Sequence, residues 1–70
     1  MSFGSKIKEI RNKMELTQAE FAEAIGCGQT AVSQYEIGQR RPSYKIAKAI
    51  ISLAKAKKIK VTLMDIFPDE

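Results

Sequence analysis

The sequence predicts a compact all-α fold of five helices in one domain, residues 1–70, and three features support this. Apolar residues recur at spacings of three and four along the chain, which is the period of an α-helix. No segment is predicted to be a strand, and a chain of 70 residues allows one small domain that buries about 60% of its unfolded surface. Helix-capping residues precede three of the apolar runs, namely Thr17, Ser43 and Thr62.

The first helix is expected over residues 5–14. Its apolar side chains are spaced for a single buried stripe, which consists of Phe3, Ile7, Ile10 and Met14. Its remaining positions are largely charged, and the basic ones are Lys6, Lys8, Arg11 and Lys13. We therefore expect an amphipathic helix with one face in the core and one basic face in solvent.

The second helix is expected to begin with a capping box at Thr17. The Thr17 hydroxyl can accept a hydrogen bond from the Glu20 amide, and the Glu20 carboxylate can accept one from the Thr17 amide. The buried face of this helix is Phe21, Ala22 and Ile25. Gly26 is expected to end the helix in a left-handed conformation, and Cys27 and Gly28 complete a turn of three residues.

The third helix is expected to start at Gln29. Its buried face is Ala31, Val32 and Tyr35, and its outward-facing side chains are Gln29, Thr30, Ser33 and Gln34. The four outward side chains are uncharged, and each can form hydrogen bonds with base edges. Residues 16–38 thus have the size and pattern of a helix-turn-helix, which places its second helix in the DNA major groove. An ordinary solvated helix face is the alternative for these four residues.

The last two helices follow a loop that ends at Pro42. Ser43 caps a helix from Tyr44 to about Lys57, whose inner face is Ile46, Ala47, Ile50, Leu53 and Ala54. Thr62 and Asp65 form a second capping box, and the side chains expected to fold back on the core before Pro68 are Leu63, Ile66 and Phe67. Apolar residues near this last helix are expected to be local core, and any exposed remainder would make a dimer patch: Ile59, Val61, Met64 and Phe67.

Charge is distributed unevenly around a net value of +4. Residues 39–60 contain no acidic residue and eight basic ones, Arg40, Arg41, Lys45, Lys48, Lys55, Lys57, Lys58 and Lys60. The end of the chain is acidic, with Asp65, Asp69 and Glu70. This asymmetry suits a polyanion such as DNA, and a solvated lysine face is the alternative. The lysines from Lys55 onward also complement the dipole at the end of the fourth helix.

Composition argues against an enzyme and against a metal site. The chain has no histidine and a single cysteine, so a zinc cluster, an internal disulfide and imidazole acid–base catalysis are not expected. No apolar run approaches the roughly 18 residues of a membrane span, and the start of the chain lacks a secretory signal. We expect a cytoplasmic protein without cofactor, metal, membrane contact or small-molecule ligand, in a compartment that keeps Cys27 reduced.

Residues 5–67 closely resemble the phage repressor/Cro family of helix-turn-helix domains, which includes phage repressors, restriction-modification controller proteins and some antitoxins. The matching residues are Arg11, the Leu-Thr-Gln run at 16–18, Ala22, Gly26, Val32, Tyr35 and the Glu-Ile-Gly run at 36–38. The resemblance implies a lambda-repressor-like domain that binds a palindromic operator as a weak, DNA-assisted homodimer. Half-sites would lie about 34 Å apart. A Cro-like repressor of a phage or prophage is the implied function.

The resemblance also implies roles for individual residues. Base contacts are expected from Gln29, Thr30, Ser33 and Gln34, and Gln29 can pair with adenine in a bidentate fashion. Phosphate contacts are expected from Gln18, Gln39, Arg40 and Arg41. Ile37 departs from the family, because many relatives carry asparagine or arginine there to bind phosphate. Arg11 and Glu36 are expected to form a partly buried salt bridge, and Cys27 is expected to act as a small hydrophobic residue rather than a redox sensor.

Two other functions fit the same sequence. An antitoxin or a restriction-modification controller would use the same DNA chemistry in a different circuit. A protein-interaction module with this fold would not read DNA at all. Salt-dependent DNA affinity separates the last alternative from the others.

Overall fold

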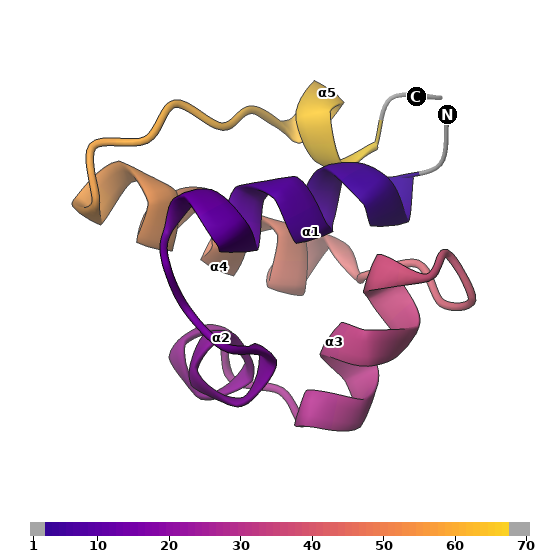
Figure 1. Ribbon diagram of the computed structural model, residues 1–70. Coiled ribbons are helices and arrows are strands. Elements are labelled where there is room, and N and C mark those ends of the chain that lie inside the picture. The colour runs from indigo at the N-terminus through magenta and orange to yellow at the C-terminus, as the bar shows by residue number, and fades with distance from the viewer. Residues whose placement is uncertain (1–2, 68–70) are drawn as a thin grey trace.

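The computed structural model describes residues 3–67, and within this range the chain forms five helices and no strand, as the sequence predicts (Figure 1). The helices are α1 (Phe3–Lys13), α2 (Gln18–Ile25), α3 (Gln29–Glu36), α4 (Tyr44–Ala56) and α5 (Leu63–Ile66). In Figure 1, α1 crosses the middle of the molecule, with α2 and α3 below it and α5 above it. The helices enclose one core, and the Cα radius of gyration is 10.5 Å.

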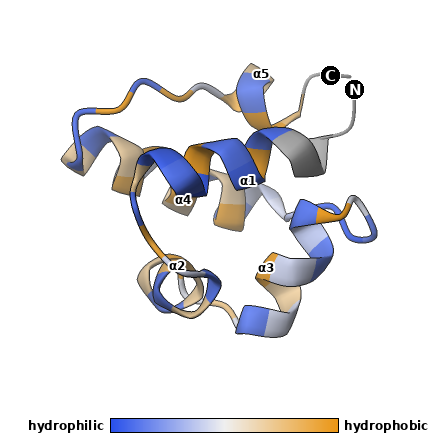
Figure 2. Cartoon of the chain, in the orientation of Figure 1, coloured by the Kyte–Doolittle hydropathy of each residue, from blue (hydrophilic) through white to orange (hydrophobic). Residues whose placement is uncertain are grey.

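The core is centred on α1, which packs against α3 on one side and α5 on the other. The hydropathy colours of Figure 2 alternate along α1 between hydrophilic and hydrophobic bands, as expected for a helix with one buried face. The largest fully buried side chains come from every helix: Ile7, Ile10, Phe21, Val32, Ile50 and Ile66. Each such burial stabilises the fold by about 1.5–3 kcal/mol before the cost of ordering the chain.

Local hydrogen bonds set the helix ends, and they confirm the expected caps. The Glu20 amide donates to the Thr17 hydroxyl at 3.1 Å, and the Thr17 amide donates to the Glu20 carboxylate at 2.9 Å. Gly26 ends α2 with φ of +80°. The Ser43 hydroxyl accepts from the Ile46 amide at 3.2 Å at the start of α4, and the Asp65 carboxylate accepts from the Thr62 amide at 2.9 Å at the start of α5.

Several expectations need correction. Helix α1 begins at Phe3 rather than residue 5, and α4 ends at Ala56 rather than Lys57. Leu63 was expected to fold onto the core, but it is 36% exposed because α5 is a single turn that turns Ile66 fully inward. Met64 is 68% exposed, whereas Val61 is buried as expected. The side chain of Phe3, and also Pro68, Asp69 and Glu70, lie outside the described residues.

No helix within residues 3–67 combines the length and the apolar character that crossing a bilayer requires.

Candidate nucleic-acid interface

Helices α2 and α3 pack against each other across the turn at residues 26–28, and α3 lies at the edge of the molecule (Figure 1). Val32 is fully buried and Tyr35 nearly so, which fixes the inner face of α3 against the core. Ala31, expected to be buried, is half-buried and packs at the core's margin. The outer face of α3 is therefore free to contact another molecule.

The four candidate base-reading residues differ in exposure. Gln29 and Thr30, in the first turn of α3, are exposed. Ser33 and Gln34 are half-buried, so that only part of each side chain faces outward. The loop after α3 folds back onto the second turn, where the Gln34 carbonyl accepts amides from residues 39 and 40 at 2.9 and 3.2 Å. The start of α3 is thus its most accessible part.

The expected ion pair of Arg11 and Glu36 is present and bidentate. Arg11 Nε donates to Glu36 Oε2 at 2.5 Å, and Arg11 Nη2 donates to Oε1 at 3.2 Å. The two side chains are only 13% and 3% exposed. Arg11 Nη1 also donates to the Leu16 carbonyl at 2.8 Å. This pair joins α1 to the end of α3 and to the chain segment that leads into α2.

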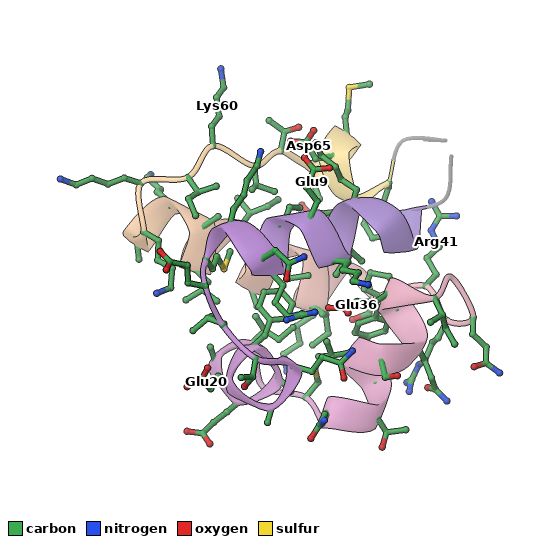
Figure 3. The ribbon with its side chains drawn as sticks, in the orientation of Figure 1. Glu9, Glu20, Glu36, Arg41, Lys60 and Asp65 are labelled. Atoms are coloured by element: carbon green, nitrogen blue, oxygen red, sulfur yellow. The ribbon has the colours of Figure 1, made fainter. Side chains whose placement is uncertain are left out.

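Gln18 has a structural contact that the sequence did not reveal. Its side-chain Nε2 donates to Glu36 Oε1 at 3.0 Å, so the first residue of α2 is tied to the end of α3. Glu36 therefore accepts hydrogen bonds from both α1 and α2. Figure 3 shows Glu36 below α1 and beside α3. The expected phosphate contact of Gln18 stays a prediction. The second hydrogen of its side-chain amide and the backbone amides at the start of α2 could still donate to a phosphate.

The loop between α3 and α4 carries exposed side chains at Gln39, Arg40 and Arg41. The Arg40 guanidinium lies 6.0 Å from the ring centroid of Tyr35, which keeps it beside α3. Arg41 lies 4.9 Å from the ring centroid of Phe67, a cation–π distance. Figure 3 shows Arg41 at the right of the view, above the loop that follows α3. The two arginines therefore lie in different surroundings.

Cys27 is half-buried in the turn and packs against the hydrophobic core. Burial raises the pKa of the Cys27 thiol above its ordinary value of 9.0, and the nearby Arg40 charge opposes this. A neutral thiol is a poor nucleophile, because the thiolate is the reactive form. The surroundings of Cys27 suit a small apolar side chain.

Comparison with known proteins shows the family to which this chain belongs. The family model described as helix-turn-helix matches residues 7–61, which is more than half of the chain. The chain belongs to the helix-turn-helix family, of the Cro/C1 type, as its sequence resemblance implied. Membership of this family supports a DNA-binding regulator.

A similar protein is an uncharacterized HTH-type transcriptional regulator, YqaE, of Bacillus subtilis (strain 168). The two sequences are 37% identical over 43 residues, and the aligned stretch covers 61% of this chain. The same stretch covers 37% of the relative, so this chain matches only a minor part of that protein's length. No solved structure matches the chain significantly.

Proposed function

We propose that this chain regulates transcription by binding specific double-stranded DNA, with α3 placed in the major groove. The observation that carries the proposal is the exposed first turn of α3, with Gln29 and Thr30 on a helix whose other end is fixed by Glu36. A rigid helix with free amide and hydroxyl groups is what direct reading of base edges requires.

Base contacts and phosphate contacts have separate places in this proposal. Gln29 and Thr30 read bases, and Ser33 and Gln34 add contacts through the exposed part of each side chain. The phosphate contacts come from residues at the two ends of the motif, which are Gln18, Gln39, Arg40 and Arg41. Phosphate contacts fix the position of the protein on the duplex, whereas base contacts give specificity.

The finer part of the proposal is a Cro-like repressor of a phage or prophage that binds a palindromic operator as a dimer in the bacterial cytoplasm. Support for self-association comes from an open apolar groove of about 420 Å³ between the start of α4 and α5. Its exposed apolar side chains are Tyr44, Leu63 and Met64. A standard interface buries roughly 800 Å² per partner, and three exposed side chains offer only a small apolar patch, so we expect the dimer to be weak without DNA.

Selection of binding sites from random duplex DNA tests the proposal. We expect enrichment of an inverted repeat whose half-sites are one helical turn apart, about 34 Å. Affinity for the selected duplex should fall as salt is raised, because phosphate contacts release counterions. A protein-interaction module would enrich no sequence and show no salt-dependent affinity. Enrichment of a single half-site would contradict the dimer and leave base reading intact.

A further inference from the structure

A second open groove lies between the last turns of α4 and the segment that leads to α5. Its volume is about 310 Å³. Its apolar lining is formed by Ile51, Ile59 and Val61, and its charged rim by Lys55, Lys58 and Lys60. All three lysines are exposed, and among residues 3–67 no carboxylate lies within ion-pair distance of them. The groove thus combines an apolar floor with three uncompensated positive charges.

The position of this groove separates it from the proposed DNA surface. In Figure 1 the end of α4 lies at the left of the molecule, whereas α3 lies at the lower right. Figure 3 shows Lys60 projecting upward from the connection between α4 and α5, away from α2 and Glu20 below. Charges farther than about 10 Å from a duplex contribute little at ordinary ionic strength. We therefore expect DNA bound to α3 to leave this groove open.

Backbone conformation at the rim adds a second observation. Lys58 has φ of +60°, a left-handed conformation in which glycine avoids the strain that a Cβ causes. The Lys58 amide donates to the Lys55 carbonyl at 3.0 Å, and the Ile59 amide donates to the Ala54 carbonyl at 2.8 Å. These bonds close α4 and turn Ile59 back toward the core. A lysine thus occupies a position where glycine would be more stable, and its charge completes the rim.

We infer that this groove binds an acidic, apolar peptide segment of a partner protein while α3 is on DNA. Glutamate or aspartate side chains would pair with the three ammonium groups, and a leucine or phenylalanine side chain would enter the floor. The phosphate backbone of a nucleic acid could pair with the lysines, but it has no apolar side chain that would fill the floor of the groove. Phosphatidylglycerol vesicles, used as a probe below, distinguish a bilayer from a peptide as the partner. The groove is separate from α3, so peptide binding does not depend on the DNA sequence that α3 reads.

Titration with a labelled amphipathic peptide of about twelve residues, built from glutamate, leucine and phenylalanine, tests the inference by anisotropy. We expect the variant Lys55→Glu/Lys58→Glu to weaken binding about tenfold. The matched control Lys8→Glu/Lys45→Glu makes the same charge change elsewhere and should leave binding within about twofold. Replacing glutamate by glutamine in the peptide, or its apolar residues by serine, should also weaken binding about tenfold.

The single variant Lys58→Gly separates binding from folding. It relieves the left-handed conformation, so the unfolding temperature should not fall, while peptide affinity should fall about two- to threefold. The inference is overturned if the peptide does not bind, if the glutamine peptide binds equally well, or if both double variants behave alike. It is also overturned if Lys55→Glu/Lys58→Glu abolishes binding to phosphatidylglycerol vesicles instead, lowers the salt slope of DNA binding, or changes the oligomeric state without peptide.

Discussion

At the scale of single residues, the Glu36 carboxylate accepts hydrogen bonds from two helices, since Arg11 of α1 and Gln18 of α2 both donate to it. Glu36 itself is in the last turn of α3 and is nearly buried. A buried carboxylate is costly unless its oxygens are satisfied, and here both oxygens have donors. Glu36 therefore adds polar contacts with α1 and α2 to the apolar packing that holds α3 on the core.

Replacing Glu36 by alanine should lower the free energy of unfolding by about 2–4 kcal/mol, because Arg11 and Gln18 are left without their acceptor in a desolvated site. The measurement is urea unfolding followed by circular dichroism. Glu9→Ala is the control, since Glu9 is half exposed and pairs with Lys6 and Lys13 at 3.5 Å. Its loss should cost about 0.5 kcal/mol or less. Equal effects of the two variants would show that the Glu36 contacts do not stabilise the motif.

Gln29→Ala should weaken binding to the selected operator by about 1–3 kcal/mol and change binding to random duplex DNA little, because a base contact is lost while phosphate contacts remain. The control is Gln39→Ala in the loop, which should weaken binding to both duplexes alike. Competition titrations with the two duplexes measure the difference. A loss of the same size on both DNAs for Gln29→Ala would assign Gln29 to the phosphate backbone instead.

Because burial raises the pKa of the Cys27 thiol, we expect the free energy of unfolding to depend on pH. The folded protein favours the neutral thiol. The contribution of the neutral thiol to the free energy of unfolding is fully present below the pKa of the thiol in the unfolded chain. It is lost as the pH rises through the pKa of the thiol in the folded protein. From about pH 8 to pH 10 the wild type should therefore lose more stability than Cys27→Ala, measured by urea unfolding. Equal losses in both proteins would mean that the thiol titrates as if it were in solvent.

At the scale of the helices, features set by local sequence could be predicted and long-range contacts could not. The capping residues Thr17, Ser43 and Thr62 act on amides within three residues, so spacing alone reveals them. The pair of Arg11 and Glu36 came from family resemblance rather than from spacing. The bond from Gln18 to Glu36 joins residues 18 positions apart, and no local pattern encodes it.

The ends of α1 and α4 show a further limit of local patterns. Glu15 and Lys58 take left-handed conformations, with φ of +58° and +60°, although helix ends of this kind usually carry glycine. Leu63 in α5 is more exposed than its sequence pattern predicts, because a one-turn helix has too few residues for periodicity to define its buried face. For the site, the sequence pattern predicts four outward polar side chains on α3, and their role in reading bases stays a prediction. The pattern does not reveal that Ser33 and Gln34 are half-buried whereas Gln29 and Thr30 are exposed.

The turn between α2 and α3 allows a matched pair of glycine substitutions. Gly26 has φ of +80°, and a Cβ there would meet no atom within 4 Å. Gly26→Ala should therefore cost only the left-handed backbone strain, about 1–2 kcal/mol. Gly28 has φ of −86° and equally open space, so Gly28→Ala should cost less, about 0.5–1 kcal/mol, because alanine is a poorer N-cap than glycine. Thermal unfolding of both variants checks this, and a larger loss for Gly28→Ala would contradict the assignment of the turn.

At the scale of the whole molecule, two separate basic regions decide the orientation proposed on DNA. One is the loop after α3, with Arg40 and Arg41, and the other is the end of α4 with the segment that follows it. Arg40 stays beside α3 through its contact with Tyr35, whereas Arg41 lies over Phe67. The proposed orientation on DNA requires the first region to approach phosphates and the second to remain distant from them.

The measurement that tests this orientation most directly is operator affinity at several salt concentrations for two double variants. Each phosphate contact adds about 0.9 to the slope of log affinity against log salt. Arg40→Ala/Arg41→Ala should lower the slope by up to about 2 per monomer and weaken specific and non-specific binding alike. Lys57→Ala/Lys58→Ala should change it by much less than about one unit, because the end of α4 lies away from α3 (Figure 1) and charges farther than about 10 Å from a duplex are screened. A larger slope change in the lysine variant than in the arginine variant would contradict the docking of α3 and its loop on DNA.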